Sequence, residues 1–129
     1  MENVKLSDKE IQLLADASSL IERGLEEKSN PSKLRLVLVE LQALRFDIGK
    51  SLGGYKATAR ITTREKYWDC KNKKMSPNAS YKEAEMDADV VEQKNARDFL
   101  EIAYNTISDF VTVNQSSLKI AAEEAKNNL

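Results

Sequence analysis

Residues 34–59 read LRLVLVELQALRFDIGKSLGGYKATA, and their apolar side chains recur at steps of three or four residues. The recurring positions are Leu34, Val37, Leu41, Leu44, Ile48, Leu52, Tyr55 and Ala59. This near-heptad spacing is typical of helices that pack at a shallow crossing angle. Asn30-Pro31 directly precedes the stretch and favours a helix start, because Asn caps exposed amides and Pro at the first helical position loses no hydrogen bond. We therefore expect one long helix over residues 31–71.

Two features modify this stripe. Leu36, Leu38 and Phe46 widen it enough to bury a second surface. Gly53-Gly54 interrupts it, and two glycines inside a helix cost about 2 kcal/mol relative to alanines. Because glycine pairs are sites of helix kinks, two interpretations stay open: a helix kinked at the pair, or a true break that makes two helices.

Further helices are expected on both sides of this one. Ser7-Asp8-Lys9-Glu10 is a capping box, and the apolar positions behind it predict a short amphipathic helix over residues 8–27. Residues 72–80 lack periodicity and contain the second proline, which indicates that the chain reverses there. Ser80-Tyr81-Lys82-Glu83 has the form of another capping box, and no Gly or Pro follows it, so a last helix is predicted over residues 81–127.

These elements predict an all-α protein. We expect a single helical domain over residues 1–129, built as an elongated, coiled-coil-like antiparallel hairpin with a short N-terminal amphipathic helix. Asn95 and Asn114 fall close to the seam of the last helix. A buried Asn at such a position fixes register or oligomeric state, whereas an Asn at the edge of the seam is simply hydrated.

The composition excludes several classes of protein. The longest apolar run is Leu36 to Val39, far shorter than the roughly 18 residues that a membrane span needs. Residues 1–20 carry charges where a signal peptide is apolar, and the single Cys70 fits a reducing compartment. We therefore expect a cytoplasmic protein without membrane contact. The formal net charge of −1 implies that any attraction to a polyanion is local.

The sequence offers little that could support catalysis. It contains no histidine, one cysteine, and neither a phosphate-binding loop nor a nucleophile elbow. Paired-metal sites in helical bundles use Glu-x-x-His, so the acidic positions after residue 82 are better explained as a solvated face than as metal ligands. We expect no catalytic residue, no metal site and no cofactor, and hence a non-enzymatic protein.

Charge is distributed unevenly along the chain. Residues 50–75 hold eight Lys and Arg against Glu65 and Asp69, a local charge of +6, whereas residues 82–101 have a local charge of −4. In an antiparallel hairpin these segments lie alongside each other, so opposite charges flank one seam. Alternatively, the basic segment binds nucleic acid, because its cations track phosphates and its rings stack on bases. The candidate nucleic-acid-binding residues are Lys56, Arg60, Arg64, Lys66, Tyr67, Trp68, Lys71, Lys73 and Lys74.

Three stretches carry a resemblance. They are Tyr67-Trp68-Asp69-Cys70-Lys71, Tyr81-Lys82-Glu83-Ala84-Glu85-Met86 and Ala96-Arg97-Asp98-Phe99-Leu100-Glu101-Ile102-Ala103-Tyr104. Over residues 34–125 the chain resembles a loose group of small all-helical proteins of tailed bacteriophages, which has no settled activity. The resemblance implies a gene among early replication and recombination genes, and a protein located in the cytoplasm of a bacterial host.

Three functional hypotheses follow. The first is a helical interaction protein that associates with itself or with a protein partner, because broad apolar stripes on a thin hairpin must be buried somewhere. The second is a nucleic-acid-binding accessory of phage recombination or replication that uses the basic segment. The third is an inhibitor of a host defence or replication protein, whose acidic face imitates DNA phosphates. That face consists of Glu83, Glu85, Asp87, Asp89 and Glu92.

Overall fold

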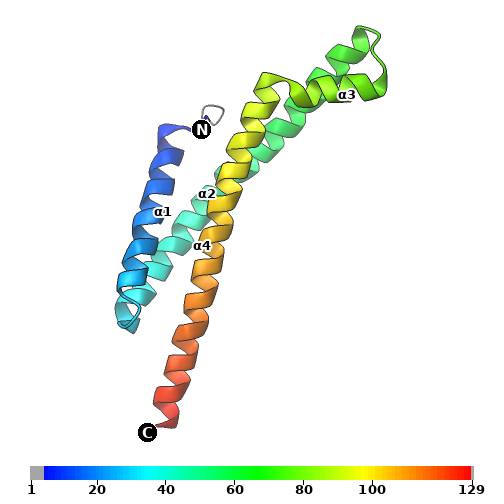
Figure 1. Ribbon diagram of the computed structural model, residues 1–129. Coiled ribbons are helices and arrows are strands. Elements are labelled where there is room, and N and C mark those ends of the chain that lie inside the picture. The colour runs from blue at the N-terminus through cyan, green and yellow to red at the C-terminus, as the bar shows by residue number, and fades with distance from the viewer. Residues whose placement is uncertain (1–4, 129) are drawn as a thin grey trace.

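The computed structural model describes residues 5–128 and contains four helices. They are α1 (Asp8–Glu26), α2 (Pro31–Asn72), α3 (Pro77–Met86) and α4 (Ala88–Asn127). The long helices α2 and α4 run antiparallel, and α1 folds back along the first half of α2 (Figure 1). The expected all-α class is confirmed, since the described residues contain no strand. No helix in this part of the chain is long and apolar enough to cross a membrane.

The first two helices begin where their capping residues predict. The Ser7 hydroxyl accepts a hydrogen bond from the Glu10 amide at 3.2 Å, and the Ser7 amide donates to Glu10 Oε1 at 2.8 Å. The Asn30 side chain accepts from the Lys33 amide at 3.3 Å, with Pro31 at the first helical position. These three hydrogen bonds satisfy amides that have no partner inside the helix.

Helix α2 continues through Gly53-Gly54, so the alternative of a true break is wrong. Neither glycine has a positive φ, and a Cβ added to either would have no neighbour within 4 Å. The buried residues Leu52 and Ala59 pack on either side of the pair. This packing outweighs the low helix propensity of glycine.

A single last helix over residues 81–127 is wrong, because the structure divides this stretch into α3 and α4. Helix α3 begins at Pro77, and the Ser76 hydroxyl caps it by accepting from the Ala79 amide at 3.2 Å. Ser80, the predicted cap, lies inside α3 and is fully buried. Asp87, with ψ of 135°, ends α3, and its carboxylate caps α4 by accepting from the Asp89 amide at 3.0 Å. Ser76-Pro77 repeats the signal of Asn30-Pro31, and it prevails over the capping-box pattern.

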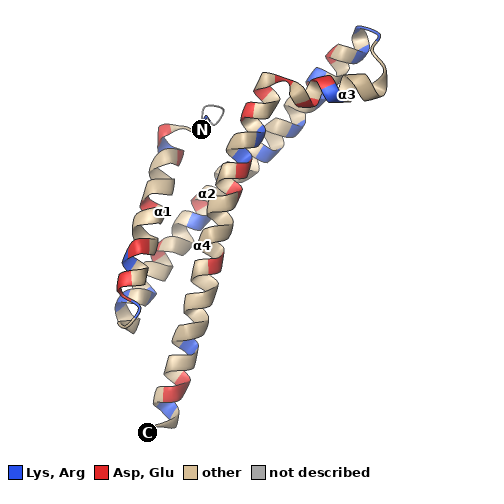
Figure 2. Cartoon of the chain, in the orientation of Figure 1, with Lys and Arg blue, Asp and Glu red and all other residues tan. Residues whose placement is uncertain are grey.

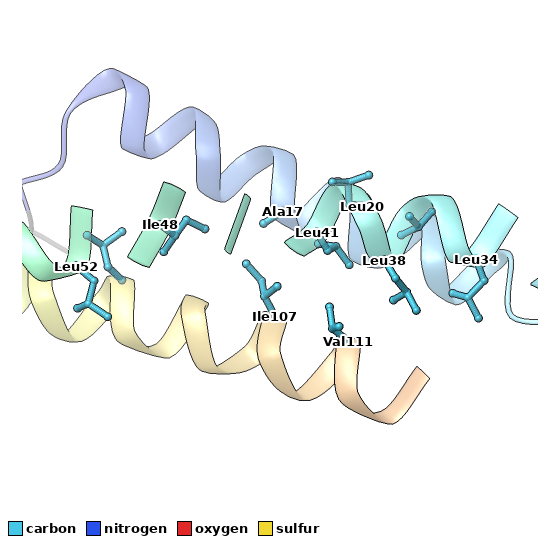
Figure 3. Close-up of a cluster of buried hydrophobic side chains, with 11 residues drawn as sticks. Ala17, Leu20, Leu34, Leu38, Leu41, Ile48, Leu52, Ile107 and Val111 are labelled. Carbon is cyan, nitrogen blue, oxygen red and sulfur yellow. The ribbon is translucent and has the colours of Figure 1, made fainter. Parts of the chain in front are cut away.

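The core lies between α2 and α4 and is covered along part of its length by α1 (Figure 3). Leu41 and Ile48 of α2 and Leu100 and Ile107 of α4 are at most 1% exposed. Helix α1 lies close to α4 at Gly24, where an added Cβ would lie 2.8 Å from Cζ of Phe110. A side chain at that position would force α1 or the ring to move.

The widened stripe of α2 is buried only in part. Leu38 is 3% exposed, but Leu36 and Phe46 are 67% and 63% exposed, so the expected second buried surface is absent from the described chain. Asn114 is buried and donates from its amide nitrogen to the Phe110 carbonyl at 2.8 Å. Its own helix therefore satisfies this donor, and no second chain is needed to do so.

Glu10 and Tyr55 tie α1 to the middle of α2. The Tyr55 hydroxyl donates to Glu10 Oε1 at 2.8 Å across 45 residues of sequence. Burial, the hydrogen bond and the charge of Glu10 raise the pKa of Tyr55 to about 12. Burial alone would raise the pKa of Glu10, but hydrogen bonds with Ser7, Tyr55 and Ser51 lower it below its ordinary value. Both shifts favour the charged Glu10 and the neutral Tyr55 that this contact requires.

Candidate functional site

A groove between the second half of α2 and the beginning of α4 gathers cations and aromatic rings. Its volume is about 780 Å³, and we call it the basic groove. Its lining residues are Lys56, Ala59, Arg60, Thr63, Arg64, Tyr67, Trp68, Tyr81, Lys94, Arg97 and Glu101. Five cations and three rings therefore face one carboxylate. Figure 2 shows basic residues on both long helices in this part of the molecule.

Helical spacing places the α2 residues of the groove on one face. Lys56, Arg60 and Arg64 recur every four residues, which aligns them along the helix. Two small residues lie between them: Ala59 is 2% exposed, and the Thr63 hydroxyl donates to the Ala59 carbonyl at 2.6 Å. These short side chains leave space between the cations. Tyr67 also lines the groove, so it lies on the same face of α2 as these three cations.

The aromatic residues lie at the end of the groove near the chain reversal. Trp68 and Tyr81 are 56% and 54% exposed, and Tyr67 is partly buried. The rings of Tyr67 and Trp68 meet edge to face, with centroids 5.4 Å apart and an interplanar angle of 80°. This contact supports an exposed indole against its neighbour, which leaves the indole accessible to a planar ligand.

Helices α3 and α4 supply residues that the sequence analysis missed. Tyr81 comes from α3, and Lys94, Arg97 and Glu101 come from α4. Lys94 and Arg97 are three residues apart in an otherwise acidic stretch, which was a readable sign of a shared helix face. Arg97 is oriented by its neighbour, since its Nη2 lies 2.8 Å from Asp98 Oδ1.

Four predicted binding residues do not line the groove: Lys66, Lys71, Lys73 and Lys74. Lys66 instead pairs with the residue that caps α4, with its Nζ 3.6 Å from Asp87 Oδ2. A second pair joins α2 to α4 at Lys56 Nζ and Glu101 Oε1, 3.7 Å apart. Opposite charges therefore do meet across the seam, although exposed pairs of this kind contribute only about 0 to 1 kcal/mol each. Arg60 and Arg64 form no ion pair within the described chain, and both line the groove.

The candidate acidic residues are divided among several environments. Glu83 and Glu85 are exposed on α3, and Asp89 is exposed at the start of α4. Asp87 pairs with Lys66, and Glu92 Oε1 lies 4.0 Å from Lys5 Nζ. The described residues contain no group of three or more His, Cys, Asp or Glu side chains placed to hold a metal ion.

The chemistry of the basic groove is that of binding. Guanidinium and ammonium groups bind phosphate oxygens, and exposed aromatic rings stack on planar bases. Comparisons with known proteins add no assignment, because no family model, no curated protein and no solved structure matches the chain.

Proposed function

We propose that this protein is a non-enzymatic binding protein that holds a single strand of nucleic acid in the basic groove. The observation that carries the proposal is the convergence of five cations and three aromatic residues from three helices on one hollow of about 780 Å³. Such a combination of a positive channel with stacking surfaces characterises sites for single strands. It fits the setting of phage replication or recombination that the sequence resemblance implies.

The exposed rings favour a single strand over a duplex. Trp68 and Tyr81 present more than half of their surface to solvent. In a duplex the faces of the bases are covered by their stacked neighbours, so only phosphates would reach the groove. A single strand can turn its bases onto these rings, and each stack contributes about 1–3 kcal/mol.

Fluorescence of Trp68, the only tryptophan, tests the proposal directly. We expect an oligothymidylate to quench it. For each tenfold rise in salt concentration, the logarithm of the binding constant should fall by about 0.7 per phosphate contact. Duplex DNA of equal length should quench less.

Inorganic polyphosphate is the control ligand, because it carries the charges without the bases. It should compete for the groove without quenching Trp68 as strongly. If no nucleic acid changes the fluorescence or binds in a parallel sedimentation assay, the proposal is wrong.

A second candidate function is self-association, and a different surface favours it. The end of α4 extends past the turn between α1 and α2 (Figure 1). Near this end, Leu25, Val113 and Ile120 are 51%, 63% and 56% exposed. Leu25 and Val113 also line a hollow of about 530 Å³ between the α1–α2 turn and α4. We propose that this apolar surface packs against a second copy of the chain.

Light scattering across a range of protein concentrations checks this second proposal. We expect an oligomer that Val113→Glu together with Ile120→Glu converts to a monomer, because two carboxylates cannot be buried without partners. Ile61→Glu is the control, since Ile61 is 57% exposed but lies in the second half of α2, away from the α1–α2 turn. A wild-type protein that stays monomeric at high concentration would contradict self-association.

The third hypothesis, inhibition of a host protein through the acidic face, has weaker support. Two of its five carboxylates, those of Asp87 and Glu92, already have cationic neighbours in the same chain.

A further inference from the structure

A second hollow adjoins the basic groove. It has a volume of about 480 Å³, and Lys56 lines both spaces. Its other lining residues include Phe46, Gly49, Lys50, Gly53 and Tyr104. We call this second space the glycine hollow. It continues the basic groove toward the middle of the molecule, along the same pair of helices.

The glycine hollow repeats the chemistry of the basic groove. Phe46 is 63% exposed, and Lys50 Nζ lies 4.7 Å from the centre of its ring. Arg45 does not line the hollow, but its guanidinium carbon lies 6.0 Å from the centre of the Tyr104 ring, which does. Cations and aromatic rings are therefore adjacent here as well, which is the arrangement that a strand of phosphates and bases requires.

Two glycines, four residues apart on one face of α2, form the floor of this space. A Cβ at Gly49 would lie 3.2 Å from the Tyr104 ring, so a side chain there would displace that ring. At Gly53 an added Cβ would meet nothing within 4 Å, so packing does not require glycine. Glycine inside a helix is destabilising relative to alanine. A side chain at Gly53 would enter the hollow, whereas Gly54 does not line it.

We propose that the glycine hollow is a second segment of the nucleic-acid site and takes the strand that leaves the basic groove at Lys56. This inference rests on the proposed function. At about 1.5 Å per residue, α2 rises about 18 Å from Lys56 to Trp68 and about 33 Å from Phe46 to Trp68. At about 3.4 Å per stacked nucleotide, these lengths correspond to about five and about ten nucleotides.

The test compares Gly53→Leu with Gly54→Leu. The first variant places a side chain in the glycine hollow, while the second adds the same side chain at the neighbouring exposed position, which lines neither hollow. Both replace a helical glycine, so both should unfold at or above the wild-type temperature. Binding is measured with labelled oligothymidylates of about five and about ten nucleotides, chosen from the two segment lengths above.

The wild type and Gly54→Leu should bind the longer oligonucleotide at least about tenfold more tightly than the shorter one, the effect of one or two additional stacks. Gly53→Leu should bind the shorter one as the wild type does and lose the gain with length. If Gly53→Leu keeps the full gain, or if Gly54→Leu loses it equally, the extension is wrong while the basic groove stands. If the wild type binds neither oligonucleotide, the proposed function falls, and this inference falls with it.

Discussion

Replacing Arg60 and Arg64 together by glutamate is expected to weaken binding of a single strand about a hundredfold at low salt. Both guanidinium groups face the basic groove and form no ion pair within the described chain. Each charge-assisted contact with a phosphate contributes about 1.5 kcal/mol or more, and two such losses correspond to about a factor of one hundred. The slope of the logarithm of the binding constant against the logarithm of the salt concentration should also become shallower, by about 0.7 for each lost phosphate contact.

Lys73→Glu together with Lys74→Glu is the matched control. It makes the same change in net charge within the same basic segment, but neither lysine lines the groove. We expect an affinity loss of less than about tenfold, because only the long-range field changes and salt screens it. Circular dichroism of both variants verifies that helicity is retained. Equal losses in the two variants would mean that the strand follows the charge of the whole segment rather than the groove.

The sequence was informative wherever a feature depends on one helix alone. The capping residues Ser7 and Asn30 set the starts of α1 and α2, because a cap acts only on the next turn. Spacing by four placed Arg60 and Arg64 on one face for the same reason. The same geometry excludes Lys66 from that face, because Lys66 follows Arg64 by two residues, which is about 200° of rotation about the helix axis. Treating the basic segment as a whole concealed this distinction.

Features that depend on two helices were not predictable from these patterns. The groove includes Tyr81, Lys94 and Arg97 because helix packing sets the position of α3 and α4 along α2. Helix α3 ends at Asp87, before α4 begins. A capping box at Ser80 matched the pattern but lies inside α3, where Ser80 is buried. Local propensity likewise left a break at Gly53-Gly54 open, whereas the buried neighbours of the pair keep α2 continuous.

The largest effect on stability is expected for Leu100→Ala. Leu100 is 0% exposed and belongs to the cluster that joins α4 to α2. Removing such a side chain costs the transfer free energy of the lost carbons and leaves a cavity, in total about 2–5 kcal/mol. Domains of this kind have a free energy of unfolding of about 5–15 kcal/mol, so the variant should lose a substantial part of it. Urea unfolding followed by circular dichroism measures the change.

Ile102→Ala is the control on the same helix. Ile102 is 68% exposed, so its truncation should change the free energy of unfolding by less than about 0.5 kcal/mol. Equal losses for the two variants would contradict the placement of the core between α2 and α4. A loss at Ile102 that grows with protein concentration would place this residue in an interface between copies, because only a bimolecular contact makes stability depend on concentration.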